Sequence, residues 1–257
     1  MASAPPAGAI QALVLALVLA LSAPAPARAE TVRLASLDWP PFSGAGLARQ
    51  GAVTAVIQEA FRAAGDTVSV TFLPWRRAVE TGLNAPGFIG YFPEYYSRGM
   101  EERCLYSRPL GRSPIGFAER RSAPVAWTSV ADLRGLTVGT VQGYINEAEF
   151  DRLAAAGEIR ADAAVDDATN LRKVAAGHLA LAVIDRNVMA FLLASDPALR
   201  KAGAALQFNA RPLEEKELFV CFRRDAAGAA AHARFEAALE GIDVQAILAE
   251  SLALPKR

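Results

Sequence analysis

Two short proline-containing turns carry aromatic and charged side chains that could bind a small molecule. The first is Leu-Asp-Trp-Pro-Pro-Phe at residues 37–42, and the second is Phe-Leu-Pro-Trp-Arg-Arg-Ala at residues 72–78. Each turn lies at the end of a short β-rich run that predicts a strand. Open α/β sheets hold small ligands at the carboxyl ends of their strands. The two turns therefore predict a binding site for a small molecule.

Four side chains of these turns are candidate ligand-binding residues, and each has a purely structural alternative. Asp38 can accept a hydrogen bond from a ligand and Trp39 can stack on its apolar or cationic part, or the turn is only rigid and its indole fills the core. Arg77 offers paired donors to a carboxylate or phosphate, or it forms a surface ion pair on the first turn of a helix. Trp75 either contacts the ligand or packs in the core.

Further candidates lie along the chain at expected strand ends and helix starts. Tyr91 and Glu94 belong to a segment that we place at a strand end facing the binding site. An aromatic ring there is equally typical of a core, whereas an ionised glutamate costs several kcal/mol to bury unpaired. Tyr144 lies at an expected helix N-terminus, where free backbone N–H groups attract anions. Asp185 ends an apolar strand and is the strongest candidate in the second half of the chain.

Sequence signatures of catalysis and of metal or nucleotide binding do not occur in the chain. The two histidines, His178 and His232, are far apart and lack the spacing of metal ligands. There is no His-Glu-x-x-His, Gly-x-Ser-x-Gly, Walker or Gly-x-Gly-x-x-Gly pattern. We therefore expect no cofactor, no metal site, no catalytic residue and no enzymatic activity.

Residues 1–29 have the pattern of a secretion signal. An apolar run, Ile10–Leu21, precedes Ala27-Arg28-Ala29, which predicts cleavage after Ala29; the alternative is a buried N-terminal helix. No later stretch approaches about 18 apolar residues, so we expect no membrane insertion. Lys and Arg together number 27, as do Asp and Glu. This balance leaves no polybasic surface for nucleic acid, so no nucleic-acid partner is expected.

The periodicity of apolar residues predicts an α/β protein. Residues 32–37 form a β-rich run, and residues 53–64 place their apolar side chains on one helix face that ends at Gly65. Residues 68–72 then alternate as a strand. This β-α-β order predicts parallel strands joined by a right-handed crossover.

A similar order recurs in the second half of the chain. Residues 136–141 predict a strand, and a helix follows from Asn146 to Ala156, with Asn146 and Glu149 as a capping box. Asp167 is the expected cap of the next helix. The second half is therefore expected to form its own α/β layer.

The chain then returns to its first half. Residues 179–184 form an apolar run typical of a central parallel strand, and residues 218–222 predict a late strand before two amphipathic C-terminal helices. Cys104 and Cys221 are the two cysteines. In an oxidising compartment they either form a bridge or stay as buried free thiols, because the sequence does not reveal their Cα separation.

Five short motifs occur in one order along the chain. They are Asp-Trp-Pro-Pro-Phe (38–42), Pro-Trp-Arg-Arg-Ala (74–78), Tyr-Ser-Arg-Pro-Leu (106–110), the Asp-Leu-x-Gly segment ending in Gly-Tyr (132–144) and the Asn-Leu segment ending in Asp (170–185). Together they resemble the bacterial extracellular solute-binding protein family 3, the periplasmic amino-acid-type substrate-binding proteins of ABC transporters.

The resemblance implies the two-lobed type II periplasmic binding protein fold, in which each lobe is a mostly parallel sheet flanked by helices. The ligand cleft then lies at the hinge between lobes that close on it. We place the first lobe at residues 30–119 and 211–257, and the second at residues 120–210. The resemblance also implies a periplasmic monomer that binds a small polar solute (amino-acid-like, an amine or an organic acid) and delivers it to an ABC importer permease.

The sequence departs from this family where amino-acid ligands are held. Met100 replaces the arginine that clamps the ligand carboxylate, which leaves Arg98 or Arg77 as a substitute. Tyr144 stands where the family has threonine, whereas Asp185 matches the amine-binding aspartate. An ordinary α-amino acid is therefore doubtful as the ligand, and a more aromatic or cationic pocket is favoured.

Two alternative functions use the same fold. Periplasmic dehydratases that act on cyclohexadienyl acids share it, and Glu94 with Arg77 would offer them acid–base and anion-holding groups. The chain can also act as a ligand-sensing module for a separate receptor.

Overall fold

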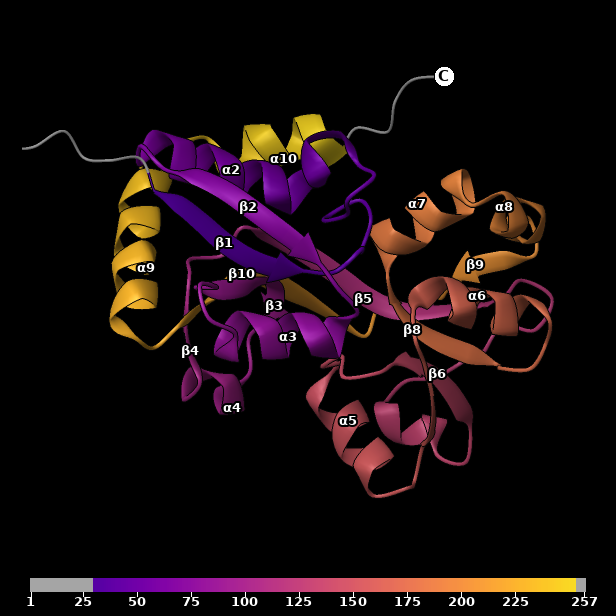
Figure 1. The fold of residues 1–257 in the computed structure, drawn as a ribbon. Coiled ribbons are helices and arrows are strands. Elements are labelled where there is room, and N and C mark those ends of the chain that lie inside the picture. Colours follow the sequence, from indigo (N-terminus) through magenta and orange to yellow (C-terminus); the bar gives the residue numbers. More distant parts are fainter. Residues whose placement is uncertain (1–29, 253–257) are drawn as a thin grey trace, which may run out of the picture. The chain divides into compact units, whose positions relative to one another are not determined.

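Ten strands joined by hydrogen bonds form the framework of the computed structural model, which describes residues 30–252. Eight of them follow one another in the order β2-β1-β3-β10-β5-β8-β6-β7, while β4 pairs with β10 and β9 with β5 (Figure 1). From Thr31 onward the chain forms one unit. The predicted secretion signal, residues 1–29, lies outside the described residues.

The first lobe contains the predicted β-α-β unit. Its strands are β1 (Thr31–Ser36), β2 (Thr67–Phe72) and β3 (Gly90–Tyr95), and β1 runs parallel to both neighbours. Ser36 lies opposite Phe72, so β1 and β2 end at the same level of the sheet. The turns that follow these two strands are therefore neighbours at one edge.

Helices cover both faces of the first lobe. α2 (Ala52–Ala63) buries the predicted apolar face and is followed by Gly65, whose φ of +85° is easily adopted by a residue without Cβ. In Figure 1, α2 and α10 lie together on one side of β1 and β2, and α3 lies on the other. The other helices of this lobe are α3 (Trp75–Asn84), α4 (Arg98–Glu101), α9 (Ala226–Leu239) and α10 (Val244–Leu252), with a 3-10 turn at Ala48–Gln50.

Two strands of ten residues, β5 (Gly111–Arg120) and β10 (Glu214–Arg223), pair with each other, and β5 continues the sheet into the second lobe. β5 pairs with β10 from Gly111 to Ile115 and with β8 from Ile115 onward. β10 also pairs with β3, so the predicted return strand at residues 218–222 is confirmed. The exact lobe boundaries stay predictions.

The second lobe forms its own α/β layer around the buried strand β8. As expected from its apolar run, every residue of β8 is buried, with a parallel neighbour in β6 and an antiparallel one in β5. In Figure 1, α6, α7 and α8 lie on one side of these strands and α5 on the other. The elements are η2 (Val130–Leu133), β6 (Thr137–Val141), α5 (Ala148–Ala155), β7 (Arg160–Ala164), α6 (Asp167–Ala175), β8 (Leu181–Asp185), α7 (Arg186–Ser195), α8 (Pro197–Gly203) and β9 (Leu206–Phe208).

Two predicted helix caps are wrong by one residue. Glu147 accepts the capping hydrogen bond of α5, so the expected box of Asn146 with Glu149 does not form. Asp166 caps α6, and Asp167 becomes the first residue of that helix. Each loop offers two adjacent polar side chains, and the backbone path of the loop, which the sequence pattern does not reveal, selects between them.

Cys104 and Cys221 form a disulfide, which settles the choice between a bridge and two free thiols. Their Cα atoms are 5.4 Å apart because β4 (Cys104–Tyr106) runs antiparallel beside β10. The bridge packs with Ala78 and Tyr91 in one buried cluster. It therefore ties an early segment of the first lobe to the strand that returns to it.

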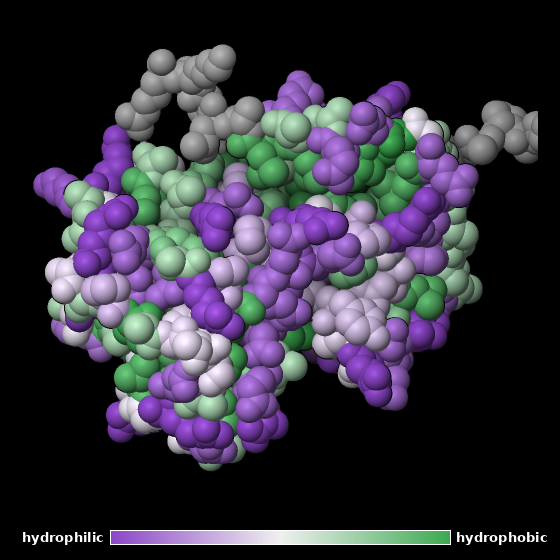
Figure 2. Space-filling view, turned by 180° about the vertical axis from the view of Figure 1, so that it is seen from behind, coloured by the Kyte–Doolittle hydropathy of each residue, from purple (hydrophilic) through white to green (hydrophobic). Residues whose placement is uncertain are grey.

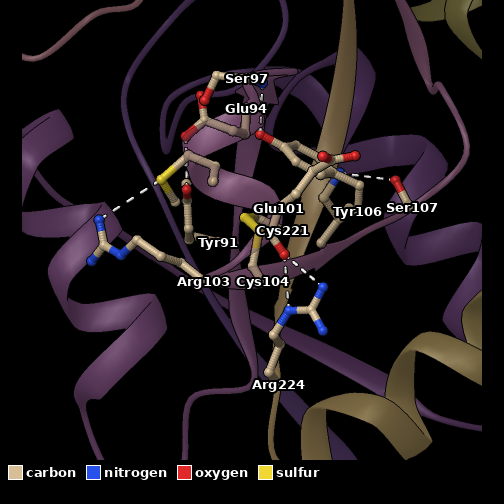
Figure 3. Close-up of a disulfide and its surroundings, with 12 residues drawn as sticks. Tyr91, Glu94, Ser97, Glu101, Arg103, Cys104, Tyr106, Ser107, Cys221 and Arg224 are labelled. Carbon is tan, nitrogen blue, oxygen red and sulfur yellow. Dashed lines mark hydrogen bonds between the residues drawn. A yellow bond between two sulfur atoms is a disulfide. The ribbon is translucent and has the colours of Figure 1, made fainter.

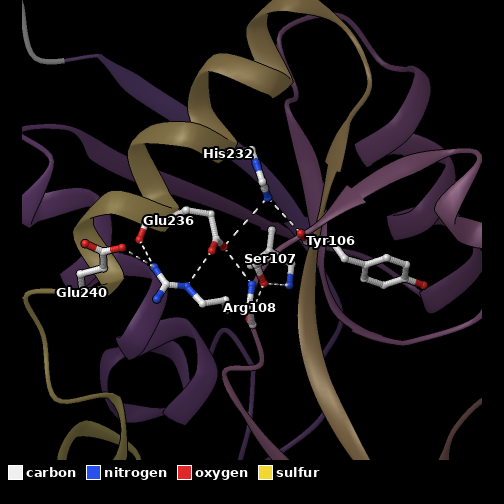
Figure 4. Close-up of polar contacts among 7 residues, drawn as sticks. Tyr106, Ser107, Arg108, His232, Glu236 and Glu240 are labelled. Carbon is white, nitrogen blue, oxygen red and sulfur yellow. Dashed lines mark hydrogen bonds and ion pairs between the residues drawn. The ribbon is translucent and has the colours of Figure 1, made fainter.

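A charged cluster fixes α9 to the segment that follows β4 (Figure 4). Arg108 donates from its backbone N and its Nε to the Glu236 carboxylate, each at 2.8 Å. His232 Nε2 lies 2.9 Å from the carbonyl oxygen of Tyr106. These contacts hold α9 on the first lobe.

The surface seen in Figure 2 is mostly hydrophilic, and apolar side chains gather near its upper edge. Among the described residues, none of the helices is both long enough and apolar enough to cross a membrane.

Candidate functional site

A cleft lies where the turns after β1 and β2 face the second lobe. Its outer part encloses about 590 Å³, within the usual range for small-molecule sites. A narrower inner part of about 20 Å³ has room for roughly one water molecule. Leu37, Trp39, Trp75 and Tyr144 line both parts. The inner part also contains Glu94 and Tyr95, and the outer part also contains Asp38, Asp166 and Asp167.

The Trp75 side chain joins the two lobes directly across the cleft. It lies at the first position of α3, and its Nε1 donates to the carbonyl oxygen of Gly143 at 3.0 Å. Its ring meets the Tyr144 ring edge-on, with centroids 6.2 Å apart. Gly143 has a φ of +81° and carries no side chain, so the backbone of the turn after β6 can approach the indole closely.

The Trp39 side chain serves the core and the cleft together. It is only 6% exposed, and its ring lies 4.7 Å from that of Phe42 and 6.1 Å from that of Tyr95. Its indole also lies close enough to Asp167 of the second lobe to lower the pKa of that carboxyl group against the effect of burial. Trp39 is therefore both a core residue and a residue of the cleft wall.

Glu94 places a buried carboxyl group at the inner end of the cleft (Figure 3). Its Oε2 accepts a hydrogen bond from the Tyr91 hydroxyl at 2.7 Å, and its Oε1 accepts one from Tyr95 N at 2.8 Å. Glu94 is only 4% exposed, and this burial raises the pKa of its carboxyl group to about 7. Tyr91 is fully buried beside the disulfide, so it supports Glu94 and does not line the cleft.

Asp167 places a second buried carboxyl group in the outer part of the cleft. Burial raises the pKa of Asp167 to about 7, and the negative charges of Asp185 and Asp166 add to this effect. The nearby Trp39 indole acts in the opposite direction. The first turn of α6 thus brings two adjacent carboxylates, from Asp166 and Asp167, to the cleft wall.

Asp185 lies behind the cleft and not among its lining residues. Its Oδ1 caps α7 by accepting from Asn187 N at 2.6 Å and Val188 N at 2.9 Å. Its Oδ2 accepts from Ser113 Oγ at 2.6 Å, and this hydroxyl lies 2.6 Å from the Tyr95 hydroxyl. Burial raises the pKa of Asp185 to about 6. The structure therefore connects Asp185 to the cleft through Ser113 and Tyr95 and through Val188, which lines the outer part.

The candidate anion-binding arginines lie outside the cleft lining. Arg77 is exposed on α3 and Arg98 is exposed on α4. Within residues 30–252, neither of them and no other arginine or lysine lines the inner or outer part. Asp38 lines the outer part with an exposed side chain whose Oδ1 accepts from Ala45 N at 2.8 Å.

Sequence reasoning overlooked Tyr95, Asp166 and Asp167 as residues of the site. Tyr95 directly follows Glu94, a candidate chosen for its position at a strand end, so the same signal could have found it. The two aspartates follow β7, whose Arg-Ala-Asp-Ala-Ala sequence contains no β-branched or aromatic residue and was not recognised as a strand. No group of three or more histidine, cysteine, aspartate or glutamate side chains suited to a metal ion occurs within residues 30–252.

No model of a known protein family and no curated protein matches the sequence. Solved structures do match the fold. A histidine kinase sensor domain with similarity to periplasmic binding proteins matches with a TM-score of 0.74 and 19% identity, over 90% of this chain and 99% of that chain. The chain has the type II periplasmic binding protein fold.

Two further structures share this fold. An ancestral arginine-binding protein bound to arginine matches with a TM-score of 0.69 and 13% identity, over 86% of this chain and 96% of that chain. An ancestral amino acid-binding protein, a precursor of cyclohexadienyl dehydratase, matches with a TM-score of 0.66 and 14% identity, over 86% of this chain and 92% of that chain. The predicted fold class is thereby confirmed, and the cleft corresponds to the expected position between the lobes.

Proposed function

We propose that the chain binds a small polar solute in the cleft between its lobes, outside the cytoplasm, and delivers it unchanged to the permease of an ABC importer. One observation carries the proposal: a single cleft is lined from both lobes, by Trp39 and Trp75 on one side and by Tyr144 and Asp167 on the other. A solute that contacts both sides favours the closed arrangement because it interacts less with separated lobes.

The likeness in fold to an arginine-binding protein bound to arginine supports solute binding. The secretion-signal pattern of residues 1–29 supports a location outside the cytoplasm. The cleft contains aromatic rings and a few polar groups, as is typical of sites for small polar molecules.

Sensing is the nearest alternative, because a histidine kinase sensor domain has the same fold over 99% of its length. The binding event is then the same and only the receiver differs. Pull-down of a permease by the solute-loaded chain supports delivery, whereas capture of a receptor kinase supports sensing.

Enzymatic activity is a second alternative, favoured by the position of Glu94 in the cleft with a pKa of about 7, which suits a general acid or base. A cyclohexadienyl acid carries carboxylates, and no arginine or lysine lines the cleft to hold them. Incubation with prephenate or arogenate tests this alternative, and turnover that Glu94→Gln abolishes would replace our proposal.

A thermal-shift screen of the exported, purified chain, unfolded and refolded to remove bound solutes, tests the proposal. The panel contains amino acids, amines, guanidines, quaternary amines and organic acids. A ligand at about 100 times its Kd stabilises the folded chain by about 2.7 kcal/mol, which is roughly 5–10 °C for a chain of this size.

Two tyrosine variants locate the binding site. Tyr144→Ala removes a ring that lines both parts of the cleft and should abolish the shift. Tyr96→Ala, at a tyrosine that is 50% exposed and outside the cleft lining, should retain it. Equal loss in both variants, or no shift with any solute, contradicts the proposal.

A further inference from the structure

The cleft contains carboxylates and aromatic rings but no lining cation. We propose that its ligand is an organic cation, an amine or a guanidine, that carries no carboxylate group. This inference rests on the proposed solute binding and specifies its chemical class.

The first argument is the charge of the lining. Asp38, Asp166 and Asp167 line the outer part, and Glu94 lines the inner part. These four carboxyl groups come from both lobes, so lobe closure concentrates negative charge around the ligand. A cation entering the cleft gains attraction from every side, whereas an anion meets repulsion.

The second argument is that two cations near Glu94, Lys216 and Arg103, have other contacts. Lys216 Nζ lies 2.9 Å from the Glu214 carboxylate and 5.5 Å from the centroid of the Tyr95 ring. Arg103 directs its Nη1 at the sulfur of Met100, at 3.7 Å. Arg103 and Lys216 each lower the pKa of Glu94, but burial outweighs their effect. Neither of these side chains lines the cleft. Among residues 30–252, no guanidinium or ammonium group lines the cleft to pair with a ligand carboxylate.

The third argument is the unused hydrogen-bonding capacity of the buried carboxyl groups. A carboxylate offers about four acceptor positions, and two donors, Tyr91 and Tyr95, account for two of those on Glu94. Burial raises the pKa of Glu94 and of Asp167 to about 7 and outweighs the hydrogen bonds to them, so the ionised form of each carboxyl group gains from an added countercharge. A bound ammonium or guanidinium group supplies both the donors and the charge.

The fourth argument is the aromatic lining. Trp39, Trp75, Tyr95 and Tyr144 surround the inner part of the cleft. Aromatic rings attract cations through the negative potential of their faces, and this attraction grows when water is excluded. Rings and carboxylates together therefore select for a positive charge on an organic body, whereas a neutral polar solute would leave the carboxylates without a partner.

Matched pairs of probes that differ by one carboxylate test the inference. We would measure Kd by calorimetry at pH 8 for agmatine against L-arginine and for cadaverine against L-lysine. Burying an ionised carboxylate without a partner is costly, so we expect the decarboxylated probe to bind at least 100-fold tighter in at least one pair. Binding of the amino acid as tightly as its decarboxylated partner, or more tightly, overturns the inference but leaves the proposed function intact.

Other outcomes separate the two proposals. Binding of an organic acid or a neutral solute, with no binding of the four cationic probes, also overturns the inference and retains solute binding. If no solute in the broader panel binds, both proposals fail.

Charge-removing variants add a second readout. Asp167→Asn and Glu94→Gln should each weaken the binding of the preferred probe at least 10-fold. Glu158→Gln is the matched control, because Glu158 pairs with Arg134 on the surface before β7, at the end opposite the cleft, and its removal should leave Kd unchanged. An equal effect of all three substitutions contradicts a role for the cleft carboxylates. Because Glu94 and Asp167 are buried, the thermal midpoint of each variant is recorded first, and the probe pairs on the unmodified chain decide the question if a variant fails to fold.

Discussion

Two buried glutamates, one in each region of the sheet, have very different surroundings. Glu94, 4% exposed, accepts hydrogen bonds from Tyr91 and Tyr95 and lies at the inner end of the cleft. Glu119 of β5, 1% exposed, accepts three: from Val125 N at 2.9 Å and from the Gln207 and Asn209 side-chain amides at 2.8 Å each.

The difference shows what distinguishes a site from a structural brace. The donors of Glu119 come from two segments separated by about 80 residues, so this carboxylate holds the segment after β5 to the segment after β9. Asn209 also accepts from Trp127 Nε1 at 3.2 Å, so the cluster around Glu119 is satisfied within itself. Glu119 also lines a hollow of about 460 Å³, so neither burial nor an adjacent hollow marks a site. What sets Glu94 apart is its free acceptor capacity beside a cleft that is lined from both lobes.

The largest expected effect concerns the disulfide. It packs beside Tyr91, which donates a hydrogen bond to Glu94, whereas Glu119 has no such bridge among its hydrogen-bond partners. Replacing Cys104 and Cys221 with alanine removes a bridge between residues 117 positions apart. Restoring this loop entropy to the unfolded chain should lower the free energy of unfolding by about 4 kcal/mol, measured by urea denaturation. Reductant should have the same effect on the unmodified chain, and an unchanged midpoint in both experiments would contradict the prediction.

The next largest effect concerns Glu119 itself. Glu119→Ala leaves one buried and two partly buried N–H donors without this acceptor and should lower the free energy of unfolding by about 3 kcal/mol. Ligand affinity, measured on the folded fraction, should stay the same because Glu119 lies outside the cleft lining. A large loss of affinity would show that the two regions are coupled.

We expect the buried carboxyl groups of the cleft, Glu94 and Asp167, to make stability depend on pH. Burial raises the pKa of Glu94 from 4.5 and that of Asp167 from 3.8, each to about 7, so the folded chain binds more protons than the unfolded chain between these values. The free energy of unfolding should therefore fall as pH rises from about 5 to about 7, by up to roughly 1.4 kcal/mol per pH unit for each group. Urea denaturation at several pH values measures this slope.

A single substitution assigns part of that slope. Glu94→Gln should reduce the slope of unfolding free energy against pH by the contribution of one titrating group. Asp167 and Asp185 still titrate in this variant. A free energy of unfolding that stays constant or rises between pH 5 and pH 7 would contradict the raised pKa values of these carboxyl groups.

The smallest effect comes from two tryptophans that each donate one hydrogen bond. Trp75→Phe removes the bond to the Gly143 carbonyl across the cleft and should weaken ligand binding about fivefold, or about 1 kcal/mol. Trp127→Phe removes the bond to Asn209 and should cost about the same in unfolding free energy, with Kd unchanged. The reverse assignment of the two effects would overturn the division between site and brace.

The order of strands and helices could be predicted because apolar periodicity is local. The run at residues 53–64 and the alternation at residues 68–72 each fix an element without reference to the rest of the chain. Caps could not be fixed in this way, since Asp166 and Asp167 are equally good candidates and only the path of the loop selects between them.

The site was predictable where it depends on strand ends and not where it depends on side-chain direction. The turns after β1 and β2 bring Asp38, Trp39 and Trp75 to the cleft wall, and their role in ligand binding stays a prediction. The helical position of Arg77 and the capping role of Asp185 depend on which way each side chain points, and the sequence does not specify this. Pairing of β4 with β10, which brings the cysteines together, is likewise a long-range property of the sheet.

Gly143 sets how closely the two lobes can approach each other. A Cβ at this position would lie 2.9 Å from Cγ of Arg76 and 3.5 Å from Cδ1 of Trp75. A methyl group there would force the Arg76 side chain or the turn itself to shift, and it would also strain a backbone with positive φ. We therefore expect a side chain at this position to limit how far the lobes close and to shorten the time for which a bound molecule stays enclosed.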